Sequence, residues 1–198
     1  MGGDDVTSYY NDVWSSTDGA SWDLVTGNAA WSGRNYHSNV VHDNKIYVLG
    51  GYDGTSRFND VWSSTDGATW SLVTGTAAWN VRLAHTSVVL DNKIYVLGGW
   101  DGTSNFNDVW SSTDGSSWVE QTNSALWSTR RGHTSVIHDN QMLVMGGYDG
   151  NYVNDIWSSI DGASWSLVTA NADWTGRRSH TSVVHGNQIF VIGGHDTS

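Results

Sequence analysis

The stretch TSVVLDNKIYVLGG, residues 86–99, decides the fold class of this chain. A β-branched run over 86–90 is followed by the short turn Asp91-Asn92, and an apolar run over 93–97 ends at Gly98-Gly99. Apolar residues at consecutive positions are typical of a strand that is buried on both faces, and Asp and Asn supply tight turns. The stretch therefore predicts two antiparallel strands, 86–90 and 93–97, with the glycine pair ending the second.

Two more strands follow in the same unit. We expect them at 108–112 and 118–122, because a Thr113-Asp114-Gly115 turn of the Asp-Gly hairpin type lies between the two runs. Four short strands in a unit of about 45–50 residues are typical of a β-propeller blade. In such a meander the first and third turns share one end of the blade, and the second loop and the crossing to the next unit share the other.

The unit repeats along the whole chain. Three series of tryptophans keep spacings of 48, 48 and 47 residues and account for twelve of the 13 tryptophans: Trp14, Trp62, Trp110 and Trp157; Trp22, Trp70, Trp118 and Trp165; Trp31, Trp79, Trp127 and Trp174. We therefore expect an all-β propeller with repeats at approximately 2–49, 50–97, 98–145 and 146–192. Residues 193–198 would begin the same loop a second time.

The order of the strands carries a prediction about ring closure. The chain enters its first unit at the third and fourth strands and leaves its last unit after the first and second. These two parts would complete one blade and cover edges that would otherwise aggregate. Two chains would give an eight-bladed homodimer, which we favour because bulky tryptophans and tyrosines between blades would crowd a tighter ring. The alternative is a four-bladed monomer.

Composition excludes several functional classes. The formal net charge is −11, with Lys45 and Lys93 as the two lysines, so neither nucleic acid nor an anionic membrane is an expected partner. The sequence has no Cys, which excludes disulfides and thiolate metal sites. No signal peptide or membrane-spanning run is recognised. The compartment stays open between the cytoplasm and a bacterial extracellular location.

Several repeated motifs carry a resemblance to a known family. They are the glycine pair, Asn-Asp-Val-Trp (107–110), the Trp that opens the fourth strand, and Arg-x-x-His before the first strand. The chain resembles kelch repeats, in the bacterial form related to the galactose oxidase propeller. One departure is the residue before that Arg, often Pro in the family and here Gly33, Val81, Thr129 and Gly176. The segment 15–22 also resembles the Asp-box turn of sialidase propellers, which we interpret as a turn device.

The resemblance does not carry an enzymatic activity with it. Galactose oxidase uses copper with a Tyr cross-linked to Cys, and this chain has no Cys. No Gly-x-Ser-x-Gly elbow, phosphate loop or His-Glu-x-x-His motif is present, and Glu120 is the single glutamate. We therefore expect a protein that is not an enzyme and needs no cofactor.

Candidate ligand-binding residues lie on the face that carries the second loop and the crossing between units. The position after the glycine pair varies among aromatic side chains: Tyr52, Trp100, Tyr148 and His195. The crossing repeats a Trp and an Arg in every unit: Trp31, Trp79, Trp127 and Trp174; Arg34, Arg82, Arg130 and Arg177. Aromatic faces stack on sugars, and a guanidinium pairs with carboxylates. Blade packing is the favoured interpretation of the repeated Trp, and pairing with loop aspartates such as Asp53 or Asp101 that of the Arg.

A ring of histidines offers a metal hypothesis that we do not favour. The series is His37, His85, His133 and His180. Four imidazoles around an axis could bind zinc or nickel, but each His also stands where a first strand begins and can bond a neighbouring blade. No metal is expected.

Three functions from different classes remain. The first is a non-catalytic, self-assembling propeller scaffold with no dedicated ligand, either a fragment or an engineered propeller, whose partner is a second copy. The second is a module that binds a glycan or a protein on the loop face. The third and weakest is an enzyme resembling a sugar epimerase or mutarotase.

Overall fold

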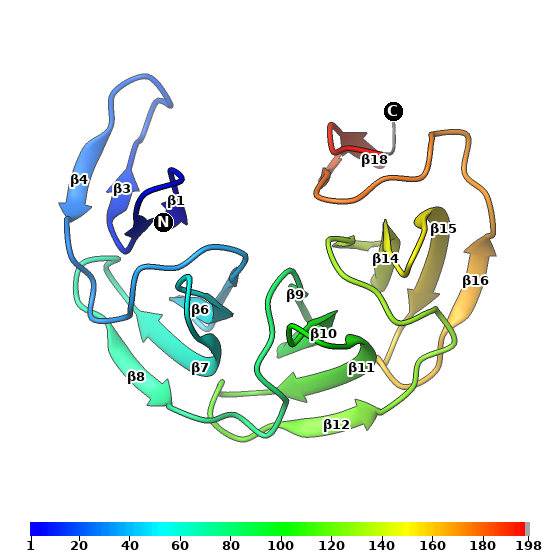
Figure 1. Ribbon diagram of the computed structural model, residues 1–198, viewed down its shortest axis with the longest axis horizontal. Coiled ribbons are helices and arrows are strands. Elements are labelled where there is room, and N and C mark those ends of the chain that lie inside the picture. Colours follow the sequence, from blue (N-terminus) through cyan, green and yellow to red (C-terminus); the bar gives the residue numbers. More distant parts are fainter. Residues whose placement is uncertain (197–198) are drawn as a thin grey trace.

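The structure, a computed structural model, describes residues 1–196 and consists of β-strands, turns and loops. Within this part there is no α-helix, and hence none long and apolar enough to cross a membrane. Thr197 and Ser198, the end of the expected 193–198 loop, lie outside the described residues. The sheets stand side by side around an open arc (Figure 1).

Three complete blades form the middle of the arc. Each is a four-stranded antiparallel meander in chain order. The first contains β5 (Ser38–His42), β6 (Lys45–Tyr52), β7 (Arg57–Ser64) and β8 (Ser71–Thr74). The second contains β9 (Thr86–Leu90), β10 (Lys93–Trp100), β11 (Asn105–Ser112) and β12 (Val119–Thr122). The third contains β13 (Thr134–His138), β14 (Gln141–Tyr148), β15 (Tyr152–Ser159) and β16 (Ser166–Thr169).

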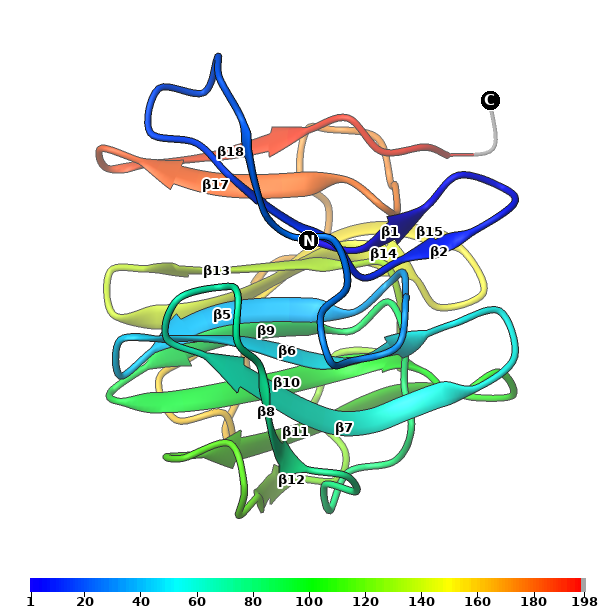
Figure 2. The ribbon, with the colours of Figure 1, turned by 90° about the vertical axis from the view of Figure 1, so that its left-hand side faces the viewer.

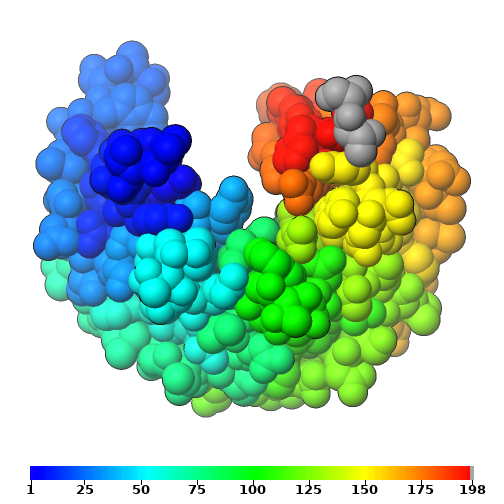
Figure 3. Space-filling model, in the orientation of Figure 1, coloured from blue at the N-terminus to red at the C-terminus, as the bar shows by residue number. Residues whose placement is uncertain are grey.

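Two-stranded sheets stand at the two ends of the arc. The N-terminal half-blade is β3 (Val13–Ser15) with β4 (Asp23–Thr26), preceded by the small hairpin of β1 (Gly3–Asp4) and β2 (Tyr9–Tyr10). The C-terminal half-blade is β17 (Thr181–His185) with β18 (Gln188–Ile192). In this structure β3 and β18 do not pair, and a gap separates the two half-blades (Figures 1 and 3). The single-chain four-bladed ring is therefore not formed here.

The strands of the second blade can be compared directly with the strand positions expected from the sequence. The first strand is confirmed at Thr86–Leu90, and the turn at Asp91-Asn92 has positive φ at both residues. The second strand is longer than expected and runs to Trp100, because Gly98-Gly99 lies inside it rather than ending it. The pairing of β10 with β11 shifts register between Leu97 and Gly99, so the glycines form a bulge. This bulge carries the strand on to the loop face.

In each blade the Asp-Gly motif forms the turn between the third and fourth strands, which we call the outer turn. In the second blade Asp114 Oδ1 accepts the backbone N–H groups of Ser116 and Ser117, and Ser112 Oγ accepts that of Gly115. These bonds favour the charged carboxylate and lower the pKa of Asp114 to about 2. Gly115 has φ of 78° and lies against the Tyr47 ring of the preceding blade. The turn is thus both a hairpin device and an inter-blade contact.

The core lies between neighbouring blades. One cluster joins Tyr47 and Leu49 of the first blade to Ile94 and Val96 of the second. The first strands β5, β9, β13 and β17 contact one another in order at the inner side of the arc, and Figure 2 shows them nearly parallel in side view. Large apolar contacts between blades, rather than within one sheet, therefore hold the arc together.

Candidate functional site

The arginine of Arg-x-x-His forms a buried clamp inside each complete blade. Arg82 donates from Nη1 to Asp108 Oδ1 (2.8 Å) and from Nη2 to Asp108 Oδ2 (2.7 Å). Nη1 also donates to the Gly98 carbonyl (2.8 Å), and the guanidinium carbon lies 4.7 Å from the Phe106 ring centroid. The Arg82 side chain is fully buried. The same clamp joins Arg34 to Asp60 and Arg130 to Asp155.

This geometry corrects the expected arginine partners. The carboxylates come from the third strands, not from the loop residues Asp53 and Asp101, which instead accept backbone N–H groups of their own loops. The Arg and Asp of a clamp are 25 or 26 residues apart, so the blade fold brings them together. Burial raises the pKa of Asp155, yet its bonds to Arg130 outweigh this and hold the pKa below its ordinary value. Arg34, Arg82 and Arg130 are closed off from the loop face.

The crossing tryptophans also lie in the core. Trp79 is 1 % exposed and meets Trp118 edge to face, with ring centroids 5.8 Å apart. Trp31 with Trp70, and Trp127 with Trp165, repeat this geometry. Trp79 also stacks near His85 at 6.2 Å. In the complete blades these residues pack the blade, as the favoured interpretation stated.

The histidine series lines the inner side of the arc, and His85, His133 and His180 are buried next to the clamps while His37 is partly buried. The Nε2 atoms of the three buried histidines bond hydroxyl groups of the preceding blade: His85 to Ser38, His133 to Thr86 and His180 to Thr134. Burial, and then the nearby Arg130 charge, lower the pKa of His133 to about 3. Among residues 1–196 no group of three or more His, Cys, Asp or Glu side chains is placed to hold a metal ion.

The buried histidines predict acid sensitivity. The folded state binds protons at His133 only near pH 3, whereas the unfolded chain binds them near pH 6.5. Stability is therefore complete above about pH 6.5 and falls as the pH drops toward the folded pKa, by up to about 1.4 kcal/mol per pH unit for each such His. Urea unfolding between pH 4 and 8 should give this slope. The variant H133Q should show a shallower slope, and an unchanged slope would contradict the assignment.

The loop face carries a second set of arginines that alternates with the variable aromatics. Arg131 lies 4.5 Å from the Trp100 ring centroid and 5.1 Å from that of Tyr148. Arg178 lies 5.2 Å from Tyr148, and Arg57 lies 5.3 Å from Tyr52 and 5.4 Å from Trp100. His195 accepts from Arg178 Nε at 2.9 Å if its Nε2 is unprotonated. All four variable aromatics therefore belong to one continuous row on this face.

A cavity of about 220 Å³ opens within this row. Its lining combines Trp100, Arg131, Arg178 and His195 with the crossing residues Tyr36, Leu83 and Ser179. Burial, and then the neighbouring Arg178 charge, lower the pKa of Arg131. Among residues 1–196 the arginine ion pairs are those of the three clamps, so Arg57, Arg131 and Arg178 have no carboxylate at ion-pair distance. These three arginines were not among the ligand-binding residues predicted from the sequence. Their departure from the repeat was the signal that could have found them.

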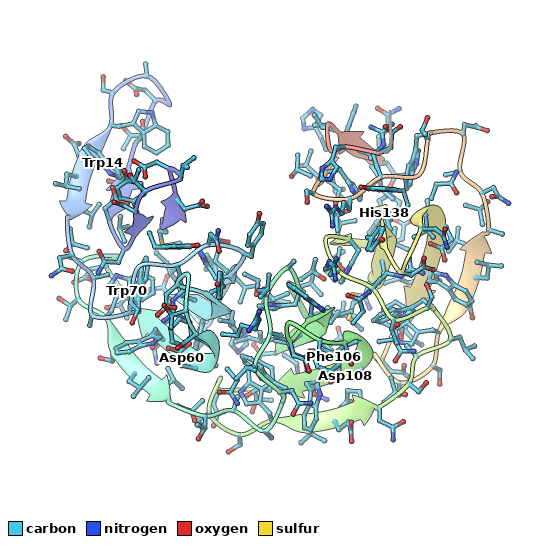
Figure 4. All side chains as sticks on the ribbon, in the orientation of Figure 1. Trp14, Asp60, Trp70, Phe106, Asp108 and His138 are labelled. Carbon is cyan, nitrogen blue, oxygen red and sulfur yellow. The ribbon has the colours of Figure 1, made fainter. Side chains whose placement is uncertain are left out.

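The two half-blades hold unmatched parts of the same repeated contacts. Arg177 donates to the Thr175 and Gly193 carbonyls, and Asp12 accepts from Trp14 Nε1. Within residues 1–196 neither Arg177 nor Asp12 has a partner of opposite charge at ion-pair distance. Among the described residues Trp174 has no edge-to-face tryptophan and its ring contacts His180, and Trp22 is 58 % exposed. Figure 4 shows the labelled Trp14 at one end of the arc and Trp70 inside it. The Arg–Asp clamp and the Trp–Trp contact are thus completed in the middle of the arc and incomplete at its ends.

A histidine of the third blade also lacks the partner that its equivalent in the first blade has. His42 Nε2 bonds the carbonyl of Thr113 in the outer turn of the next blade at 2.9 Å. His138 occupies the same place in the third blade, but its Nε2 is buried and has no partner among residues 1–196. The equivalent of Thr113 for His138 would be Thr17, in the outer turn of the N-terminal half-blade.

The blades, their clamps and their inter-blade cores define the chain as a β-propeller scaffold. The family model of the KLHDC2/KLHL20/DRC7 Kelch-repeats domain matches residues 1–194. The chain therefore belongs to the kelch-repeat family, which confirms the resemblance seen in its motifs. Kelch domains are generally non-catalytic binding scaffolds that mediate protein interactions. A comparison with curated proteins gives no significant match.

Proposed function

We propose that this chain is a non-catalytic propeller scaffold that assembles with a second copy of itself through its half-blades. The observation that carries the proposal is the divided clamp. Three complete blades each bury an Arg–Asp pair. Arg177 at one end of the arc and Asp12 at the other have no such ion-pair partner in the part of the chain that the structure describes. Two copies placed end to end would pair Arg177 of one with Asp12 of the other, twice, in an eight-bladed ring.

The complete blades give the register of the joint sheet. In the first blade Val48 pairs with Trp62 and Leu49 with Val61. The equivalent positions are Val191 and Ile192 in β18 and Trp14 and Val13 in β3. Antiparallel pairing of β18 with the partner's β3 would therefore set Val191 opposite Trp14 and Ile192 opposite Val13. This pairing would satisfy the unpaired backbone edges of both strands.

Exposed apolar surface at the half-blades supports the same joint. Trp22 is 58 % exposed, whereas its equivalents Trp70 and Trp165 are 7 % and 4 % exposed. Ile192 is 53 % exposed, whereas its equivalent Leu97 is fully buried. Burying such side chains contributes about 1.5–3 kcal/mol each. Two joints per ring would thus gain a core of the kind that already lies between the complete blades.

The mass of the protein in solution tests the proposal. Sedimentation equilibrium over a wide range of protein concentration should give twice the chain mass of 21.6 kDa. A mass of one chain at all concentrations would overturn it, whether the chain stays open or closes on itself as a four-bladed ring. Higher open-ended polymers would also contradict a closed ring of two.

A second candidate function rests on the arginine row of the loop face. Two guanidinium groups, those of Arg131 and Arg178, lie over the Tyr148 ring, and the Tyr152 ring meets it edge to face. Aromatic surface that cations already occupy is poorly available for stacking on a sugar. The two guanidinium groups, by contrast, retain hydrogen-bond donors that suit a planar carboxylate. The face therefore favours an acidic protein segment over a neutral glycan.

The double variant R131A/R178A tests this candidate. Because each charge-assisted hydrogen bond contributes about 1.5–3 kcal/mol, affinity for a polyglutamate peptide should fall by about tenfold or more. Isothermal titration in low salt measures it, with neutral and uronic-acid oligosaccharides as comparison ligands. The control is K93A, which removes a positive charge at the opposite end of the second blade. Equal affinity of all three proteins would contradict the candidate, and tighter binding of an oligosaccharide would reassign the ligand.

A further inference from the structure

Two segments of the chain have the form of the same piece of blade. Residues 2–5 read Gly-Gly-Asp-Asp and residues 193–196 read Gly-Gly-His-Asp. Both glycine pairs already have the positive φ of the bulge in the complete blades: 61° and 108° in the first segment, and 67° and 87° in the second. Each segment is therefore shaped as the end of a second strand where it passes the third strand.

The complete blades show what such a glycine pair does. The second glycine donates its N–H to the carbonyl of the Arg that begins the next blade: Gly51 to Arg82, Gly99 to Arg130 and Gly147 to Arg177, at 2.8–2.9 Å. It also pairs across to the third strand, as Gly51 does with Phe58. We call this position of the second glycine, between the Arg carbonyl and the edge of the third strand, the seat. Each blade has one seat, because it has one such carbonyl and one such edge.

The N-terminal segment occupies this seat on its own half-blade. Gly3 donates to the Arg34 carbonyl at 2.9 Å, and Gly3 and Asp4 pair with Tyr10 and Tyr9. Asn35 Nδ2 adds a bond to Asp4 Oδ1 at 2.8 Å. The short loop that follows is held by Asp5.

The C-terminal segment has the backbone conformation that would let it occupy the same seat on a second copy. His195 exchanges both backbone hydrogen bonds with Arg178 at 3.1 Å, as Trp100 does with Leu83 in the second blade. Among residues 1–196, however, no Arg carbonyl lies beyond Gly194 to accept its N–H. When β18 pairs with the partner's β3, Gly194 arrives at the carbonyl of the partner's own Arg34, which Gly3 of that chain already occupies.

We propose that residues 2–5 and the partner's residues 193–196 compete for one seat, so that the N-terminal segment must leave when two copies join. This inference rests on the self-assembly proposed above. The incoming segment continues β18 without interruption and keeps its bonds to Arg178, whereas β1 is held by a two-residue pairing. The longer strand therefore displaces the shorter one, and the N-terminal segment weakens assembly by the strength of its own contacts.

Two truncations give opposite outcomes. Removal of residues 2–5 frees the seat and takes away the Gly2 N–H bond to the Asp12 carbonyl, but it leaves the Asp12 side chain and β3 in place. It should strengthen self-association by about tenfold, which corresponds to the loss of one or two competing backbone hydrogen bonds. Removal of residues 194–198 takes away the incoming segment but keeps the Gly193 carbonyl that Arg177 contacts, and it should weaken association by a similar factor. The control D5A leaves the backbone of the seat intact, loosens the loop that holds β1, and should strengthen association to a smaller extent.

Hydrogen exchange supplies a readout that is independent of affinity. The N–H of Gly3 should be protected in dilute monomer and lose protection in the assembled protein, while that of Gly194 should gain it. If the N-terminal segment instead stays in place, removing residues 2–5 will weaken association and Gly3 will stay protected, which overturns the inference while self-assembly stands. A protein that remains a monomer in every variant refutes the self-assembly proposal itself.

Discussion

The single charge reversal R177D is expected to abolish self-association over the micromolar range. In the joint sheet this side chain would meet Asp12 of the second copy inside a clamp of the kind that is fully buried at Arg82. Leaving one member of a buried ion pair without its partner costs about 3–5 kcal/mol, and an aspartate opposite Asp12 adds repulsion. Each ring has two such joints. The dissociation constant should therefore rise by more than about a hundredfold.

The paired reversal separates the clamp from general disruption. D12R alone should fail to associate, because Arg177 then faces an arginine, whereas D12R/R177D restores opposite charges at both joints. We expect the double variant to recover association to within about tenfold of the parent. Sedimentation velocity measures all four proteins, and far-ultraviolet circular dichroism checks that each is folded. Equal association of parent and single variants would show that the joint does not contain this clamp.

The variant D108A is expected to give the largest loss of folding stability. Arg82 has no exposed surface, and Asp108 accepts two of its hydrogen bonds at 2.7 and 2.8 Å. Removing the carboxylate leaves a buried guanidinium that keeps its hydrogen bonds to the Gly98 and Asn80 carbonyls and its ring contacts with Phe106 and Trp79, but has no negative partner. The free energy of unfolding should fall by about 3–5 kcal/mol.

Asp12 provides the matched control for this loss. It is the repeat equivalent of Asp108, and it bonds Trp14 Nε1 as Asp108 bonds Trp110 Nε1, but it has no arginine within the described chain. D12A in dilute monomer should therefore change stability by no more than about 1 kcal/mol. Urea unfolding at low protein concentration compares the two. Similar losses in both variants would mean that Asp108 acts through Trp110 rather than through Arg82.

The blade repeat could be predicted because its signals are local. The spacing of the tryptophans, the apolar run 93–97 and the Asp-Gly turn each depend on residues within one unit, and strand periodicity and turn chemistry act over a few residues. The first strand, Thr86–Leu90, was therefore placed correctly. The bulge at Gly98-Gly99 was missed because the same dipeptide can end a strand or bend it, and only the partner strand decides between the two.

The residue partners lay beyond such reasoning. The sequence determined that this chain builds kelch-type blades, that its first unit consists of third and fourth strands and that its last unit consists of first and second strands. The tertiary structure decided that Arg82 meets Asp108 rather than Asp101, and that Arg131 and Arg178, rather than the repeated arginines, line the loop-face cavity. The physical reason is distance along the chain. A guanidinium on one crossing can reach several carboxylates, and the approach of strands about 26 residues apart selects one of them.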